Sequence, residues 1–191
     1  MAGGYGRTEI WALAHRASIG AGLPPKMATE AARATLWLRA RGIEACDPLL
    51  SLLFQHDEQS AHCADPAQPG DSGDTAWHCP LRCGAVLRDR GPAALPPQLN
   101  RLALPVLLLP ALAETALGPV AITWAGGRAW TDGDGIACDA PPGMADVTIA
   151  PTGAIAARPD RPAPEPEPDQ MILAALAIYA ARAGADRAES A

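Results

Sequence analysis

Five cysteine and histidine side chains in the middle of the chain could hold a metal ion. They are His62, Cys63, His78, Cys79 and Cys83. Zinc prefers three or four thiolate or imidazole ligands in a tetrahedral arrangement, which two His-Cys pairs and a further cysteine could supply. The spacing is unfavourable, because three residues separate Cys79 from Cys83 and no second closely spaced pair follows. We therefore keep this metal site as a candidate and favour buried or incidental thiols.

The same residues offer thiol chemistry as an alternative. A nucleophilic cysteine needs a base or a positive charge that keeps it as the thiolate. His78 is adjacent to Cys79, but adjacent side chains of an extended segment point to opposite faces. A metal-dependent or thiol-using small-molecule enzyme, or a ligand-binding protein, centred on His78, Cys79 and Cys83 is thus the rival hypothesis.

Two tryptophans near the N-terminus are candidate anchors for a partner protein. Three short helices can present a groove to a partner, and the large amphipathic rings of Trp11 and Trp37 suit such an interface. Either ring could equally belong to the core. Lys26, Arg33 and Arg41 share a stripe with Trp37, but Glu30 lies in that stripe, so a solvated helix face explains the charges better than DNA binding.

Composition narrows the class of protein. The chain has 191 residues and a net charge of −6, which disfavours binding to nucleic acid or an anionic membrane. Five cysteines, an odd number, argue against a disulfide framework, and neither a signal peptide nor an apolar run long enough to span a bilayer is visible. We expect a reduced, cytoplasmic protein forming a single domain.

The N-terminal region predicts a three-helix unit over residues 8–56. Thr8 and the Asp47-Pro48 pair are expected to cap the first and third helices. Apolar residues recur at helical spacing between these caps. Residues 57–75 are acidic and rich in Gly and Pro, which predicts a long loop.

Residues 76–156 predict a mainly β region. Residues 84–87 suggest a strand, whereas residues 102–109 fit either a buried strand or a helix and residues 111–117 a short helix. Residues 120–124 and 128–131 flank a Gly-Gly turn and predict a hairpin. Two further segments complete the organisation, a Pro-rich acidic linker over residues 157–168 and a helix over residues 169–184.

Two family resemblances accompany these patterns. The segments Glu9–Ala17, Gly20–Pro24, Glu30–Ala34 and Trp37–Gly42 resemble an uncharacterised bacterial family, mainly proteobacterial, of a domain of unknown function. The resemblance continues more loosely at Cys79-Pro80, Gly84-Ala85, Leu107–Pro110 and the Trp124 hairpin, so it spans most of the chain. It implies no known activity. Residues 9–50 also resemble, more weakly, the helical start of type 2 malate/L-lactate dehydrogenases. Residues 44–47 here lack the histidine that follows Arg-Gly in those enzymes, so no catalytic role transfers.

The sequence therefore predicts an α+β fold with an N-terminal three-helix unit, a small antiparallel sheet and a C-terminal helix. Phosphate-binding loops, nucleophile elbows and zinc-protease motifs are missing from the sequence. The leading hypothesis is accordingly a non-catalytic cytoplasmic accessory or protein-interaction protein. Whether the chain is an enzyme, and which cofactor or substrate it would use, is not decided by the sequence.

Overall fold

The computed structural model describes residues 5–66, 75–116, 118–152 and 164–189. The chain divides into two compact units. The helical unit comprises residues 1–60 and 164–191, and the sheet unit comprises residues 61–163. The sheet unit is thus inserted between two parts of the helical unit along the chain.

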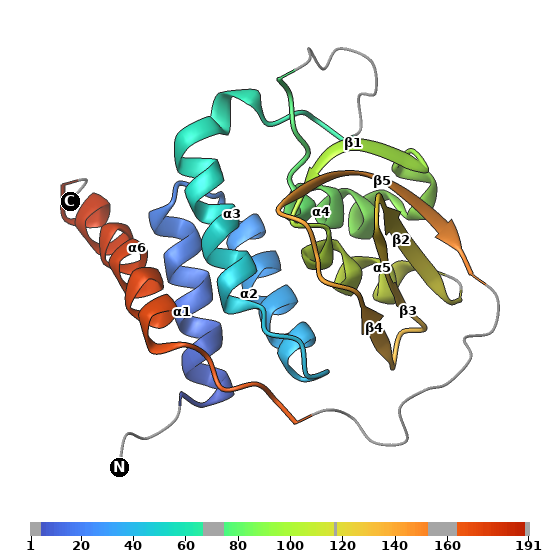
Figure 1. Cartoon of the computed structure of the whole chain (residues 1–191). Helices are drawn as coiled ribbons and strands as arrows, with labels where there is room; N and C mark the ends of the chain where they lie inside the picture. Colours follow the sequence, from blue (N-terminus) through green and yellow to red (C-terminus); the bar gives the residue numbers. More distant parts are fainter. Residues whose placement is uncertain (1–4, 67–74, 117, 153–163, 190–191) are drawn as a thin grey trace. The chain divides into compact units, whose positions relative to one another are not determined.

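The helical unit contains α1 (Arg7–Gly20), α2 (Pro25–Arg39), α3 (Cys46–Gln59) and α6 (Gln170–Glu189). The predicted three-helix unit and the C-terminal helix are confirmed, and α6 extends beyond residue 184. α1 packs along both α2 and α6, as Figure 1 shows. Gly20 permits the approach to α6, because a Cβ at that position would collide with the carbonyl oxygen of Tyr179. The core of this unit is therefore a layer of small and aliphatic side chains.

The helix starts differ from the predicted caps. α1 begins after Gly6, whose amide donates to Glu9 Oε2 at 2.7 Å, so Thr8 lies inside the first turn. α3 begins after Ala45, and Asp47 lies in its first turn. The Glu44 carboxylate accepts the amides of Cys46 and Asp47, both at 2.9 Å, and does the capping instead. Asp169 does cap α6, since Met171 N donates to its Oδ1 at 2.7 Å.

The sheet unit contains an antiparallel sheet in the order β1-β5-β2-β3-β4. Its strands are β1 (Gln98–Ala103), β2 (Val120–Trp124), β3 (Gly127–Thr131), β4 (Ile136–Cys138) and β5 (Met144–Pro151). The predicted hairpin is confirmed as β2–β3, which pairs Val120 with Thr131 and Trp124 with Gly127. Gly126 at φ 87° supplies the left-handed turn residue that a tight hairpin needs.

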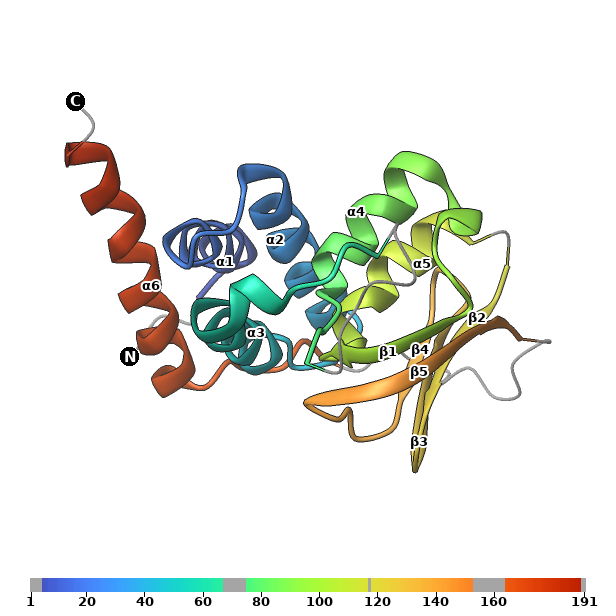
Figure 2. The same cartoon turned by 90° about the horizontal axis from the view of Figure 1, so that it is seen from above.

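Two helices, α4 (Pro80–Arg90) and α5 (Leu109–Thr115), cover one side of this sheet (Figure 2). Alternate strand residues point toward them and are buried, among them Val120, Ile122 and Ala129. Their partners on the opposite side, such as Thr123 and Arg128, are exposed. The period of two along each strand thus places the core between the sheet and the helices.

Several predictions for the middle of the chain were wrong. Residues 84–87 belong to α4 and form no strand, so the region is less dominated by strands than expected. Residues 57–59 continue α3, and η1 (Ser60–His62) follows, so the acidic loop begins later than predicted.

Three other predictions concern residues 102–109, the acidic loop and the Pro-rich linker. Residues 102–109 are neither one strand nor one helix: β1 ends at Ala103, and η3 (Pro105–Leu108) leads into α5. Residues 67–74, and 157–163 of the predicted linker, lie outside the described residues.

Candidate functional site

Only some of the five predicted metal-site residues lie close together in the structure. Backbone pairing brings Cys63 beside Trp77, with Ala64 N donating to Trp77 O at 2.8 Å and Trp77 N donating to His62 O at 3.0 Å. Cys79 follows as the residue that precedes the first turn of α4. The Cys79 thiol and amide N–H both donate hydrogen bonds to the Cys63 sulfur. Two segments of the chain thus place one thiol against another at the start of a helix.

The two histidines stand apart from this thiol pair. His62 is exposed at the end of η1. His78 pairs with β1, since its amide donates to Arg101 O at 3.0 Å and its carbonyl accepts from Ala103 N at 3.1 Å. Burial lowers the pKa of His78, and its Nδ1 has no hydrogen-bond partner among the described residues. Within the described ranges, no group of three or more His, Cys, Asp or Glu side chains could hold a metal ion.

The environments of Cys63 and Cys79 differ sharply. Hydrogen bonding from Cys79, helped by the Arg82 guanidinium and opposed by burial, lowers the pKa of the half-buried Cys63 thiol to about 7. Donation to Cys63 and complete burial raise the pKa of Cys79 well above its usual value. Burial also raises the pKa of Cys83, one helical turn further on. Cys63 is therefore the more readily ionised thiol of the pair, and Cys79 is its hydrogen-bond donor.

A second feature of the sheet unit is an apolar cavity of about 580 Å³. Its walls come from α4, the segment before β1, the end of α5, and the neighbouring ends of β2 and β5. The lining residues are Leu87, Pro92, Leu95, Pro96, Pro97, Leu112, Thr115, Ala116, Gly118, Pro119, Val120, Ile149, Ala150, Pro151 and Thr152. None of them is charged, and the hydroxyl of Thr115 already donates to Ala111 O at 2.7 Å. The cavity can bind an apolar group, and its walls contain no acidic or basic side chain.

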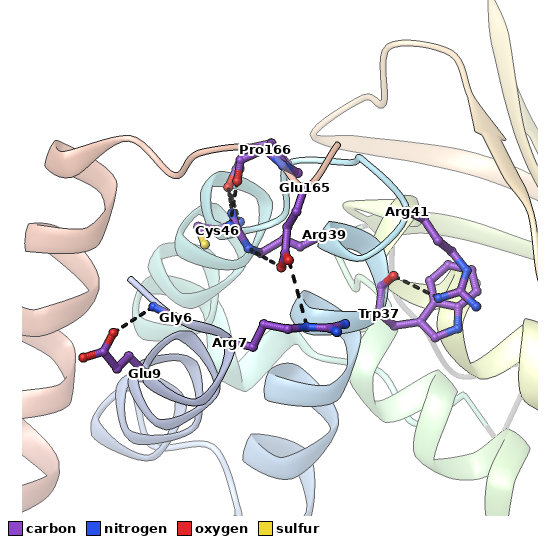
Figure 3. A network of polar contacts seen from close by, with 10 residues as sticks. Gly6, Arg7, Glu9, Trp37, Arg39, Arg41, Cys46, Glu165 and Pro166 are labelled. Atoms are coloured by element: carbon purple, nitrogen blue, oxygen red, sulfur yellow. Dashed lines mark hydrogen bonds and ion pairs between the residues drawn. The ribbon is translucent and has the colours of Figure 1, made fainter. Parts of the chain in front are cut away.

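The helical unit contains a polar network around a buried arginine (Figure 3). The Arg39 side chain is 4% exposed, and its Nη2 donates to Pro166 O at 2.6 Å. Carboxylates of Glu44 and Glu165 lie 3.6 and 3.7 Å from other guanidinium nitrogens. Burial and the Glu44 carboxylate raise the pKa of nearby Cys46 to about 12, against the influence of Arg39. These contacts tie the segment before α6 to α2, with one hydrogen bond from Nη2 and ion pairs at Nη1 and Nε, which make no hydrogen bond among the described residues.

The two tryptophans singled out in the sequence occupy different settings in the helical unit. Trp11 is 39% exposed and stacks on His15, with ring centroids 5.1 Å apart. Trp37 is half-buried, and the Arg41 guanidinium lies 3.7 Å above its ring. Neither ring is a fully buried core residue. Sequence reasoning did not identify the cavity or Arg39, because no local pattern distinguishes their residues from ordinary core and surface positions.

Comparison with known proteins reaches only the first part of the chain. A family model described as "Protein of unknown function (DUF3726)" matches residues 7–73, from α1 to beyond the Cys63 segment. The expected likeness to a domain of unknown function is confirmed over that range. Neither a curated protein nor a solved structure matches the chain. In the described part of the chain, the helices lack an uninterrupted apolar stretch of the length that a bilayer span requires.

Proposed function

We propose that the chain is a non-catalytic binding protein whose sheet unit takes up a small, uncharged, mainly apolar molecule. The observation that carries this proposal is the cavity of about 580 Å³, which lies within the usual range for small-molecule sites. Transfer of apolar surface from water into such walls provides the driving force for binding.

The composition of the walls selects the ligand class. A charged ligand would lose its hydration without gaining a partner, because the lining offers no opposite charge. A polyproline segment is also disfavoured, since grooves for such peptides are lined by aromatic rings and this lining has none. Five prolines among the lining residues restrict the backbone and favour a cavity that is present before the ligand binds.

Titration with the neutral dye Nile red tests the proposal. We expect saturable binding to the full chain with a blue shift of dye emission. Ala116 and Ala113 form a matched pair, because both are half-buried alanines at or next to the C-terminal end of α5 but only Ala116 lines the cavity. Ala116→Phe should weaken dye binding by about tenfold or more by filling the site, whereas Ala113→Phe should leave it unchanged. Equal affinity in both variants, with the fold retained by circular dichroism, would exclude this cavity as the binding site.

A second candidate, self-association through α6, follows from an exposed apolar stripe. Met171 is 80% exposed and Ile178 is 64% exposed, seven positions further along the same helix. Ala174 lies between them on that face and is also exposed. An uncharged stripe is self-complementary, so its natural partner is a second copy of this chain.

Sedimentation velocity tests self-association. The wild type should form a dimer that Met171→Glu and Ile178→Glu abolish, while Arg16→Glu, at an exposed position of α1, should leave it unchanged. A monomeric wild type at high concentration would rule out this candidate.

Binding of another partner protein through Trp11 and Trp37 remains a further proposal, and Trp11→Ala is its direct probe because that ring is the more exposed of the two.

Five expectations from the sequence are also kept here as proposals. They are the cytoplasmic location, the bacterial source, the likeness of residues 9–50 to type 2 malate/L-lactate dehydrogenases, the absence of nucleic-acid binding, and a metal site at His62, Cys63, His78, Cys79 and Cys83. Native mass spectrometry of the chain purified without chelators tests the metal site, because a bound zinc would add to the mass of the bare chain.

A further inference from the structure

Two thiols from separate segments meet in the sheet unit. The Cys63 segment pairs with Trp77 through two backbone hydrogen bonds, and Cys79 lies two residues beyond that partner. The Cys79 thiol donates directly to the Cys63 sulfur. The two sulfur atoms are therefore neighbours, as a disulfide requires. This contact comes from the fold, since the residues between the two cysteines carry no spacing motif of a redox pair.

We propose that Cys63 and Cys79 form a reversible disulfide when the protein meets hydrogen peroxide, with Cys63 as the attacking thiol and Cys79 as the resolving thiol. The roles follow from access. Cys63 is half-buried and can be reached by a small oxidant, whereas Cys79 is fully buried and donates its thiol hydrogen to the Cys63 sulfur.

The chemistry proceeds in two balanced steps. The Cys63 thiolate attacks one peroxide oxygen, the O–O bond breaks, and a sulfenic acid forms while the other oxygen leaves as hydroxide and takes up a proton to become water. The Cys79 sulfur then attacks the sulfenic sulfur. The S–O bond breaks, the S–S bond forms, and the oxygen departs as water with the Cys79 proton. The two thiols are oxidised and the peroxide is reduced to two molecules of water.

The surroundings of Cys63 support its role as nucleophile. The Cys79 thiol and amide donate to the sulfur, and the Arg82 guanidinium also favours the thiolate, while Asp65 and burial act in the opposite direction. With its pKa at about 7, roughly half of Cys63 is ionised near neutrality. Cys138 provides a contrast in the same unit, because burial and Asp139 raise its pKa to about 11 although it is also half-buried.

The first experiment treats the reduced full chain with one equivalent of hydrogen peroxide. Remaining thiols are then blocked with N-ethylmaleimide, and the protein is mapped by mass spectrometry. We expect a disulfide-linked peptide joining Cys63 to Cys79, reversed by dithiothreitol. Cys79→Ser should instead accumulate a Cys63 sulfenic acid that dimedone traps, whereas Cys63→Ser should keep its four thiols. Cys138→Ser is the matched control and should form the same disulfide as the wild type.

A second readout follows the pH dependence of alkylation of each cysteine by iodoacetamide. Cys63 should react about tenfold or more faster than Cys138 at neutral pH, with a midpoint near pH 7. Cys79→Ala removes the thiol donor and should move that midpoint to higher pH, whereas Cys79→Ser keeps a hydroxyl donor and should move it less.

Three results would overturn the proposal. One is a folded wild type in which Cys63 reacts no faster than Cys138. Another is peroxide treatment that links Cys63 to Cys83 or to a second chain. The third is a bound zinc that must be removed before any of these thiols reacts. Nile red binding separates this proposal from that of the cavity, because none of the cysteines lines the cavity.

Discussion

The helical unit contains a buried arginine with oxygen atoms of the same chain around it, whereas the sheet unit contains an uncharged cavity that can accept an apolar ligand. Arg39 meets Pro166 O, Glu44 and Glu165, so its charge is compensated within the fold. The cavity walls contain only apolar and hydroxyl-bearing residues, and no described side chain fills the cavity. The polar network of the helical unit is thus structural, whereas the small-molecule binding that we propose uses the sheet unit.

Removal of the buried charge should have the largest effect on stability. Arg39→Met deletes the hydrogen bond to Pro166 and both ion pairs, and it leaves Glu165 without this partner. We expect a loss of about 3 kcal/mol in the free energy of unfolding, measured by urea denaturation. Arg33→Met in the same helix is the control, because its pair with Glu30 involves a side chain that is 45% exposed, and should cost less than about 1 kcal/mol.

The same denaturation curves examine the expected single domain. If both units unfold together, helical ellipticity and Nile red binding are lost at one urea concentration in the wild type and in Arg39→Met. Separate transitions would show two domains. Equal stability of Arg39→Met and Arg33→Met would contradict the structural role of the network.

A close helix contact should have the next largest effect. In Gly20→Ala the added Cβ would meet the Tyr179 carbonyl and lie 3.1 Å from Ala183 N, so α1 and α6 must separate. We expect a loss of about 2 kcal/mol by urea denaturation, despite the better helix propensity of alanine. Arg16→Ala, on the exposed part of the same helix, is the control and should change stability little. A stabilised Gly20→Ala variant would mean that the two helices are not in contact.

An exposed ion pair of the sheet unit should have the smallest effect. Arg88 Nε lies 2.8 Å from Glu114 Oε2, with side chains 15% and 40% exposed. Glu114→Gln keeps the shape and removes the charge, so we expect less than about 1 kcal/mol, diminishing further in high salt. Thermal unfolding at low and high ionic strength measures the loss of stability and its dependence on salt. A loss as large as that of Arg39→Met would remove the contrast between the two units.

Prediction from sequence succeeded where the signal was local. Helical spacing of apolar residues located α1, α2 and α3, and the Gly-Gly turn located the β2–β3 hairpin. The strand predicted at residues 84–87 was wrong because a short apolar run fits either a strand or a helix. The better signal was Pro80, which occupies the first turn of α4, together with Cys83 and Leu87, four residues apart on one buried face.

The candidate site was predictable only as a collection of residue types. The sequence by itself determined an α+β chain with no recognised catalytic motif, a hairpin, and cysteines near one another along the chain. Tertiary structure decided that Cys63 meets Cys79, that Arg39 pairs with Glu165, and that residues from two helices and two strands enclose a cavity. Local periodicity reports which face of an element is buried. It does not encode which distant segment covers that face, because that choice follows from the packing of all elements together.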